Sequence, residues 1–293
     1  MDIGDETTLF RNAVSGLTAL DDPGLEPPYR WTATGFSSVV VTTNNGFIVR
    51  VARTSAAAER NAATVALLAA LSGRLPVGIP EAARVLPRSA DMPHGALVYA
   101  RVPGEPLTPS AAAPRSLVGD LADFLVRLHQ QPVSVVGNLR SEDGSIFESL
   151  IPRLRTLVPR NGIEALTRWR DAFSRLLTET ASVPLHGDFW HENMLVSHGR
   201  LSGVIDWEAA RFGPAALDLC PLWALGPDIG RAVSAHYAKA VGLDVDVLVR
   251  QVGLCRVRRE LDGLAWSLDN DDSVELTESV GKLQAAVGDL ILL

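Results

Sequence analysis

A carboxylate, an amide and a second carboxylate lie close together in the second half of this chain. Asp188 and Asn193 are five positions apart, and Asp206 follows the next apolar run. This set of side chains suits phosphoryl transfer, in which one Asp receives the acceptor hydroxyl while the Asn and the second Asp bind Mg²⁺ on the nucleotide phosphates. We therefore predict that Asp188 is the catalytic residue and that Asn193 and Asp206 are metal ligands.

The elements around these residues are expected to bring them together. Residues 194–197 and 201–205 have the pattern of two short strands, and His-Gly-Arg between them is typical of a turn. A hairpin would place Asn193, at the start of one strand, close to Asp206, at the end of the other. Their oxygen atoms would then converge on one cation.

The expected role of Asp188 is to orient a hydroxyl group rather than to ionise it in advance. An alcohol is far too weak an acid to be fully deprotonated by a carboxylate of ordinary pKa, so Asp188 would accept the proton late, when transfer is well advanced. His186, two positions earlier, is predicted to support the loop through a hydrogen bond between its imidazole and the backbone.

These motifs resemble those of a known family. The segment 186–193, His-Gly-Asp-Phe-Trp-His-Glu-Asn, and the segment 205–208, Ile-Asp-Trp-Glu, are similar to the catalytic and metal-binding loops of aminoglycoside phosphotransferases. The resemblance implies a protein kinase-like fold and an ATP- and Mg²⁺-dependent phosphotransferase, with GTP as an open alternative to ATP. The acceptor would be a small-molecule hydroxyl, on an antibiotic of aminoglycoside, macrolide or basic peptide type or on an ordinary metabolite alcohol.

The same resemblance gives a role to Asp218. The segment 214–219, Pro-Ala-Ala-Leu-Asp-Leu, is similar to a family segment whose Asp accepts hydrogen bonds from the catalytic loop, although Gly213 replaces the Asp common before that Pro. An Asp in such an apolar setting needs hydrogen-bond partners, so we expect Asp218 to support the loop. Glu208 and Arg211 follow Asp206 closely and are left open between substrate contact and solvated surface.

The nucleotide phosphates are expected to meet a turn near residue 36. Neither Gly-x-Gly-x-x-Gly nor a Walker A sequence is present. The turn with Gly35, Ser37 and Ser38 can offer backbone N–H groups and hydroxyls, and the resemblance supports phosphate binding there. By the same analogy, adenine would bind the main chain from Ala100 to Val102, with two apolar residues below it, Leu195 and Ile205.

Arg50 is the predicted cation for the phosphates. The first lysine of the chain is Lys239, so an arginine must take this role in the N-terminal half. Arg50 either faces an anion, as the resemblance favours, or lies on the exposed face of an alternating strand, with Arg53 as the fallback. The family pairs this cation with a helix Glu, which the spacing places near Thr64. The only acid in that helix is Glu59, so its part in such a pair is an open question.

The first third of the chain has β-rich patterns and the remainder is mainly helical. The expected elements are a hairpin over 36–51 with Asn-Gly at its turn, a strand over 95–102, and helices over 56–71, 117–130, 163–180 and beyond 221. These patterns predict an α+β class. The resemblance implies a two-lobe kinase-like fold, with a small β-rich lobe over 1–102 and a larger, mainly helical lobe over 103–293.

Composition limits the function classes further. The chain has 293 residues, of which 47% are apolar, and a formal net charge of −7, which argues against a nucleic-acid partner. The two cysteines have no metal-type spacing, and neither a signal peptide nor an apolar run of membrane-spanning length is visible. We therefore expect a cytoplasmic monomer without a membrane partner.

Two other functions compete with phosphoryl transfer. A nucleotide-binding regulatory module would share the phosphate-binding features, but the intact Asp188, Asn193 and Asp206 argue against it. The pattern His186-x-Asp188-x-x-His191 also suits Zn²⁺, yet the other histidines are scattered and complete no hydrolase site.

Overall fold

The computed structural model of the chain describes residues 3–34, 37–109, 115–137, 139–269 and 272–291. The chain forms two compact units. The first consists of the described residues of Met1–Pro106, Pro132–Asn138 and Asn193–Ala209. The second consists of those of Leu107–Gln131, Leu139–Glu192 and Ala210–Leu293.

The first unit is built on a five-stranded antiparallel sheet. In spatial order its strands are β1 (Arg30–Thr34), β2 (Ser38–Thr42), β3 (Phe47–Ala52), β5 (Ala96–Ala100) and β4 (Glu81–Leu86). The hairpin predicted from the Asn-Gly turn is present as β2 and β3. Gly46 in this turn has a positive φ of 83°, which glycine adopts without steric cost because it lacks a Cβ.

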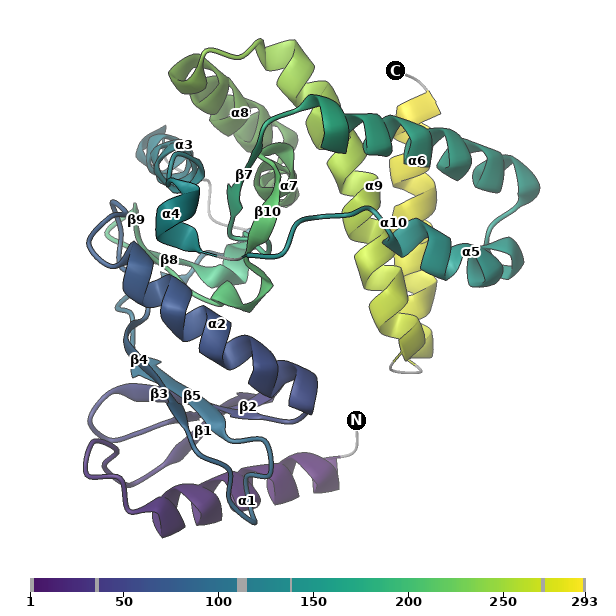
Figure 1. Cartoon of the computed structure of the whole chain (residues 1–293). Helices are drawn as coiled ribbons and strands as arrows, with labels where there is room; N and C mark the ends of the chain where they lie inside the picture. The colour runs from purple at the N-terminus through teal and green to yellow at the C-terminus, as the bar shows by residue number, and fades with distance from the viewer. Residues whose placement is uncertain (1–2, 35–36, 110–114, 138, 270–271, 292–293) are drawn as a thin grey trace. The chain divides into compact units, whose positions relative to one another are not determined.

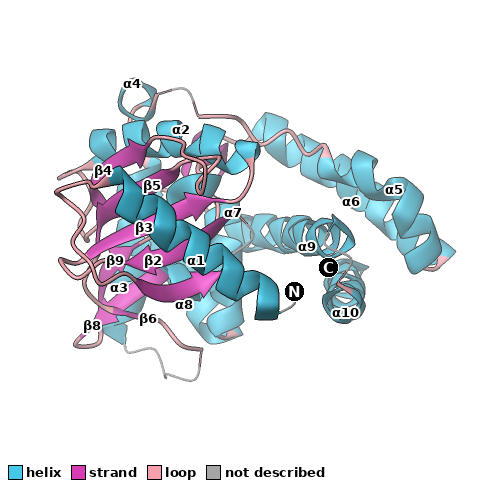
Figure 2. Cartoon of the chain, turned by 90° about the horizontal axis from the view of Figure 1, so that it is seen from below, coloured by secondary structure: helices cyan, strands magenta, loops and turns pink. Residues whose placement is uncertain are grey.

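The two faces of this sheet have different surroundings. Alternate residues of the strands, among them Val39, Val41, Val49 and Val51, pack with Ala13 and Leu17 of α1 (Ile3–Leu20) in one core cluster. Helix α2 (Ser55–Leu71) contacts β3, β4 and β5, and it lies on the opposite side of the sheet from α1 (Figures 1 and 2). Because side chains alternate along a strand, Arg50 lies on the face away from α1.

A second, three-stranded sheet in the first unit carries the predicted metal ligands. Its strands are β6 (Glu105–Pro106), β8 (Met194–Ser197) and β9 (Arg200–Val204), in the order β6-β8-β9. β8 and β9 form the antiparallel hairpin expected from the sequence, with Met194 paired to Val204. The short helices α4 (Val133–Val136) and η2 (Trp207–Ala209) belong to the same unit.

The second unit is mainly helical. Its helices are α3 (Arg115–His129), α5 (Ile146–Leu157), α6 (Arg160–Glu179), α7 (Ala216–Leu219), η3 (Cys220–Leu225), α8 (Pro227–Val241), α9 (Val245–Asp269) and α10 (Ser273–Ile291). A two-stranded antiparallel ladder joins β7 (Ser182–Leu185) to β10 (Arg211–Pro214). α9 packs along α10, and α3 packs against α8 (Figure 1).

The predicted α+β class is confirmed. The N-terminal part holds the antiparallel sheet, the C-terminal part is mostly helical, and the helices expected over 56–71, 117–130 and 163–180 correspond to α2, α3 and α6. Helix α1 was not predicted. Its signal is present in the sequence, because Leu9, Phe10, Ala13 and Leu17 recur at the spacing of one helical face and pack in the core of the first unit.

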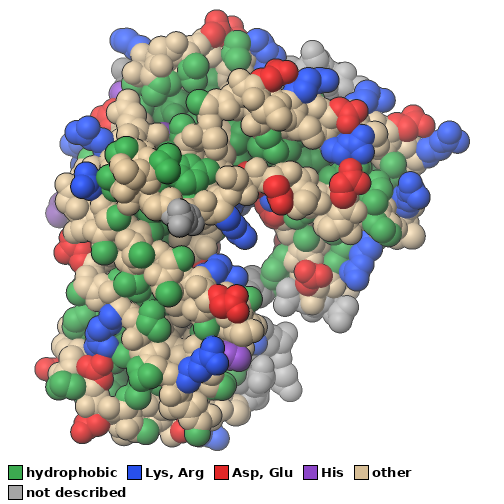
Figure 3. All heavy atoms as spheres, viewed as in Figure 1, with side chains coloured by type: hydrophobic (Ala, Val, Ile, Leu, Met, Phe, Trp, Pro, Cys, Tyr) green, Lys and Arg blue, Asp and Glu red, His purple; other side chains and the backbone are tan. Residues whose placement is uncertain are grey.

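One face of the molecule carries charged side chains of both signs. Acidic and basic side chains are interspersed over the face drawn in Figure 3, in keeping with the modest net charge of −7. None of the helices in the described ranges combines the length and the apolar character needed to cross a lipid bilayer.

Candidate functional site

The loop after β7 holds the backbone of Asp188 and leaves its side chain exposed. His186, the first residue of this loop, is completely buried. Its Nδ1 accepts a 3.3 Å hydrogen bond from the backbone N–H of Asp188, and the carbonyl oxygen of Asp188 accepts one of 2.8 Å from the N–H of Trp190. The imidazole therefore makes the kind of backbone contact expected for loop support.

Asp218 in α7 binds the two residues that precede Asp188. Its Oδ2 accepts a hydrogen bond from the N–H of His186 at 2.7 Å, and its Oδ1 accepts one from the N–H of Gly187 at 2.9 Å. Burial raises the pKa of Asp218, but hydrogen bonds from His129 and from the backbone N–H of Gly187 outweigh it and leave the pKa below its ordinary value. Asp218 therefore stays ionised and can accept several hydrogen bonds.

His129 completes this buried group, and the sequence did not single it out. It is the last residue of α3, its Nε2 lies 3.2 Å from Asp218, and its Nδ1 lies 2.9 Å from the hydroxyl of Tyr237 in α8. These partners are far apart in the chain, so no local motif joins them. The available signal was the place of His129 four residues after the buried Leu125, on the apolar face of its helix.

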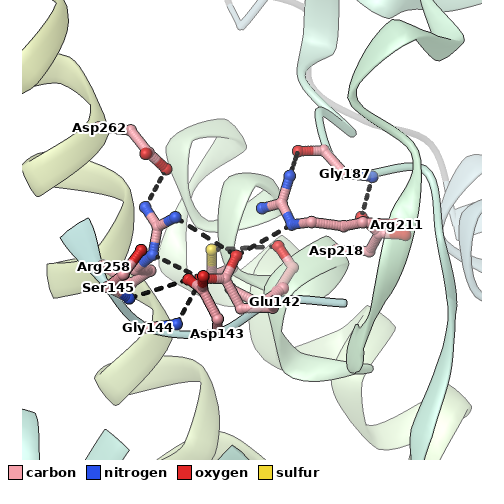
Figure 4. Close-up of polar contacts among 11 residues, drawn as sticks. Glu142, Asp143, Gly144, Ser145, Gly187, Arg211, Asp218, Arg258 and Asp262 are labelled. Atoms are coloured by element: carbon pink, nitrogen blue, oxygen red, sulfur yellow. Dashed lines mark hydrogen bonds and ion pairs between the residues drawn. The ribbon is translucent and has the colours of Figure 1, made fainter. Parts of the chain in front are cut away.

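A buried ion network supports the loop through Gly187 (Figure 4). Arg211 donates from Nη1 to the carbonyl oxygen of Gly187 at 3.2 Å, and its Nε lies 3.1 Å from Glu142 Oε2. Glu142 also accepts a hydrogen bond from Arg258 Nε at 3.1 Å, and Arg258 pairs in turn with Asp262. The Glu142 side chain is only 3% exposed, so its charge depends on these two guanidinium groups. The Arg211 side chain is only 12% exposed, so the alternative of solvated surface is wrong for this residue.

The residues that follow Asp188 make protein contacts. Arg259 in α9 stacks over the ring of Trp190, with its guanidinium carbon 3.8 Å from the ring centroid. His191 Nδ1 lies 3.1 Å from the carbonyl oxygen of Leu107. Within the described part of the chain, no three His, Cys, Asp or Glu side chains group as a protein-bound zinc ion would require. The zinc alternative therefore finds no ligand set there.

In the first unit, the β8–β9 hairpin brings the chain at Asn193 to the chain at Asp206. Asn193 ends η1 (His191–Asn193), and its carbonyl oxygen accepts a 2.9 Å hydrogen bond from the N–H of Ile205. Asp206 has a positive φ of 66°, a conformation that Asp and Asn adopt more readily than other residues with a Cβ. An amide and a carboxylate supply the oxygen ligands that Mg²⁺ prefers, so this pair fits that ion.

Arg50 faces carboxylates in the first unit. Its Nη1 lies 2.9 Å from Asp206, its Nη2 lies 3.0 Å from Glu208, and its Nε donates to Ser38 Oγ at 3.2 Å. Only 12% of the Arg50 side chain is exposed, so the alternative of a solvent-facing arginine is wrong. Glu59 in α2 is exposed, and the carboxylates that pair with Arg50 come from Asp206 and Glu208 instead.

Comparison with known proteins identifies the family. The model of the phosphotransferase enzyme family matches residues 33–251, a span that contains Asp188, Asn193 and Asp206. The chain belongs to the phosphotransferase enzyme family. Comparison with curated protein sequences found no match.

Solved structures share the fold of this phosphotransferase at low sequence identity. The GDP complex of wild-type aminoglycoside 2'-phosphotransferase-IIIa is 19% identical, with a TM-score of 0.81 over 96% of this chain and 99% of that one. Macrolide 2'-phosphotransferase MphH from Brachybacterium faecium is 19% identical, with a TM-score of 0.67 over 92% and 97%. The streptomycin-ATP-APH(2")-IIa ternary complex is 21% identical, with a TM-score of 0.70 over 92% and 95%. The expected kinase-like fold is thereby confirmed.

The predicted nucleotide-binding residues of the phosphotransferase fall in the first unit. The hydroxyls of Ser37 and Ser38 lie 3.4 Å apart, while Gly35 lies outside the described residues. Since Ser38 also accepts a hydrogen bond from Arg50, this turn and the arginine form one polar group.

The residues predicted to contact adenine also belong to this unit. Ala100 ends β5, Val102 and Leu195 are buried, and Ile205 is half-buried. Val102 and Leu195 both pack against Gly203, where an added Cβ would collide with the Val102 side chain. Of the two residues predicted as the apolar floor, Leu195 thus packs beside Gly203.

Proposed function

We propose that this phosphotransferase transfers the γ-phosphoryl group of ATP to a hydroxyl group of a small-molecule antibiotic. The observation that carries the proposal is the exposed Asp188 on a loop whose backbone is bound by His186 and Asp218. A carboxylate positioned in this way can orient an acceptor hydroxyl for in-line attack.

The proposed reaction places the chemistry at Asp188. The acceptor oxygen forms a bond to the γ-phosphorus as the bond to the β,γ-bridging oxygen breaks, and ADP leaves. Asp188 accepts a hydrogen bond from the acceptor hydroxyl throughout, and the proton passes to its carboxylate late in the transfer. Such a role needs a carboxylate that the acceptor can reach, which the exposure of Asp188 allows.

The nucleotide would be bound by residues of the first unit. Asn193 and Asp206 would hold Mg²⁺, which when bound neutralises charge on the phosphates. Arg50 and the turn at Ser37 and Ser38 would bind phosphate oxygens, because a guanidinium can donate two parallel hydrogen bonds to them. Adenine would contact the main chain of Ala100 to Val102.

The acceptor class is inferred from structural neighbours. Solved structures with the same fold include a GDP and kanamycin complex, a gentamicin complex and a streptomycin-ATP complex of aminoglycoside phosphotransferases, as well as a macrolide phosphotransferase. At about 20% identity these neighbours support the fold directly, and they favour an antibiotic acceptor over an ordinary metabolite alcohol as the first class to test.

An acceptor screen tests the proposal. Consumption of ATP and of GTP is measured with aminoglycosides, macrolides, basic peptide antibiotics and metabolite alcohols, and we expect ATP turnover that depends on an antibiotic. Asp188→Asn should lower kcat by about 10²–10⁴-fold and leave nucleotide affinity within several-fold of wild type. Asp171→Asn in α6, a matched change at an exposed ion pair with Arg170, should leave kcat close to wild type.

The screen also separates the competing functions. If only metabolite alcohols supported ATP turnover, the acceptor would be a metabolite alcohol and not an antibiotic. Nucleotide binding without consumption in the presence of any acceptor would favour a regulatory module. An Asp188→Asn variant that kept more than about a tenth of wild-type kcat would remove Asp188 from the catalytic role.

A further inference from the structure

Two carboxylates flank Arg50, and they differ in their access to solvent. Arg50 Nη1 lies 2.9 Å from Asp206, and Nη2 lies 3.0 Å from Glu208. The Asp206 side chain is 32% exposed, whereas that of Glu208 is 10% exposed. A ligand arriving from solvent can therefore reach Asp206 more readily than Glu208. Of the two ion pairs that Arg50 makes, the one with Glu208 is better shielded from solvent.

The chain around Glu208 is well anchored. Glu208 lies in η2, next to Trp207, which is 2% exposed and donates from Nε1 to the carbonyl oxygen of Val204 at 3.0 Å. Helix α2 packs against η2 in the same unit. This anchoring ties Glu208 to the β8–β9 hairpin, so its carboxylate has a fixed position from which to orient a guanidinium.

We propose that Glu208 is a positioning residue, which keeps Arg50 aligned for the nucleotide phosphates while Asp206 binds Mg²⁺. This role rests on the function proposed above. One carboxylate cannot neutralise Arg50 and coordinate a divalent cation with full strength at the same time. Glu208, the less exposed of the two carboxylates, resolves this conflict, because Arg50 keeps an ion-pair partner when Asp206 coordinates the metal.

Loss of Glu208 should therefore weaken the coupling between Mg²⁺ and the nucleotide. Without it, Arg50 has Asp206 as its remaining carboxylate partner in this group, and the metal must displace that contact. Thermodynamic linkage makes the effect reciprocal, so Mg²⁺ should improve nucleotide affinity less than in the wild type. Affinity for the nucleotide without metal should change little, because Asp206 still orients Arg50 in that state.

Calorimetric titration with ADP tests the proposal without relying on turnover. Dissociation constants are measured with and without Mg²⁺ for the wild type, Glu208→Gln, Glu208→Asp and Glu59→Gln. In Glu208→Gln the gain in ADP affinity on adding Mg²⁺ should fall by about 5-fold or more, within the usual range of such couplings, while the metal-free affinity stays within about twofold. Glu59→Gln, a matched change on the exposed surface of α2, should behave as wild type.

Each outcome bears on the assignment. Glu208→Asp retains the charge and should recover part of the Mg²⁺ effect, and it replaces Glu208→Gln if that variant does not fold. An unchanged Mg²⁺ effect in Glu208→Gln would overturn the positioning role alone, and if Glu208→Gln does not fold, an unchanged effect in Glu208→Asp would do so. Equal losses with and without Mg²⁺ would overturn it in favour of general structural support. Failure of the wild type to bind ADP would overturn the proposed function and this role together.

Discussion

Asp218 Oδ2 accepts a 2.7 Å hydrogen bond from the backbone N–H of His186, which lies 32 residues earlier in the chain. The other oxygen of the same carboxylate accepts one from Gly187, whose positive φ of 83° favours glycine. Because these two residues lead directly into Asp188, the position of the proposed catalytic carboxylate depends on a buried charge in α7.

Replacement of Asp218 by Asn should therefore destabilise the fold and slow catalysis. An amide cannot accept hydrogen bonds at both of its ends, so one backbone N–H loses its partner. We expect the free energy of unfolding, measured with urea at pH 7, to fall by about 3 kcal/mol. Asp171→Asn, at the exposed pair with Arg170, serves as the control and should stay close to wild type.

Asp218 also predicts how the free energy of unfolding depends on pH. The pKa of Asp218 is lower in the folded protein than its ordinary value of 3.8, so the unfolded chain binds the proton first as the pH falls. The stabilisation by Asp218 is thus complete above about pH 4 and is lost as the pH drops toward the folded-state pKa. The difference in unfolding free energy between wild type and Asp218→Asn should shrink below pH 4. A difference that stayed constant down to pH 3 would contradict the assignment.

Local patterns in the sequence were sufficient to predict the hairpins that hold the candidate site residues. Apolar alternation around Asn-Gly predicted the β2–β3 hairpin, and the strands on either side of His198-Gly199-Arg200 predicted the approach of the chain at Asn193 and Asp206. Both inferences depend on residues that are neighbours in sequence. Turn chemistry and side-chain alternation act over that range.

Contacts between residues far apart in the sequence could not be predicted from local patterns. Glu142 and Arg258 are 116 positions apart, and His129 and Asp218 are 89 positions apart, so only the tertiary fold brings them together. Glu208 was left open between substrate contact and solvated surface, and the structure pairs it with Arg50. A charged residue has no local pattern that reports its burial, because burial depends on which distant element packs over it.

Glu142 offers a second test of loop support (Figure 4). Glu142→Gln leaves the guanidiniums of Arg211 and Arg258 without their shared carboxylate in a buried setting. We expect a loss of about 3–5 kcal/mol in unfolding free energy, as is usual when one partner of a buried ion pair is removed. Because Arg211 also binds the carbonyl oxygen of Gly187, kcat should fall while nucleotide affinity is retained.

A matched control for Glu142 lies on the surface. Glu148→Gln in α5 removes a carboxylate that pairs with the partly exposed Arg170, and it should leave both the urea midpoint and kcat near wild type. If Glu142→Gln lost stability but kept its full kcat, Arg211 would have no part in positioning the loop.

The backbone at Asp206 decides which substitution tests the metal site cleanly. At a φ of 66°, Asn is tolerated, whereas Ala brings a strain of about 1–2 kcal/mol. We expect Asp206→Asn and Asp206→Ala both to raise the Mg²⁺ concentration needed for half-maximal turnover, and Ala to lower stability further. Metal titrations paired with urea unfolding measure the two effects separately. An unchanged Mg²⁺ requirement in Asp206→Asn would place the metal elsewhere.

Arg50 is expected to bind the nucleotide phosphates, and it also pairs with Asp206 and Glu208. Arg50→Ala should raise the KM for ATP and lower kcat, with little change in the KM for the acceptor, because its guanidinium is proposed to bind phosphate oxygens. It should also destabilise the protein, since Asp206 and Glu208 would lose the cation between them. Arg50→Lys restores the charge but not the planar fork, so it should recover only part of the ATP kinetics.

Arg53, which follows β3, is the other arginine that could bind the phosphates, so the Arg53→Ala variant is compared with Arg50→Ala. We expect Arg53→Ala to change the KM for ATP much less than Arg50→Ala, because Arg50 is the one of the two held beside Asp206. Impaired ATP kinetics in Arg53→Ala alone would move phosphate binding to the end of the strand. If neither variant changed the KM for ATP, the phosphates would be held by the metal ligands and by the turn at Ser37 and Ser38, and the pairing of Arg50 with two carboxylates would be purely structural.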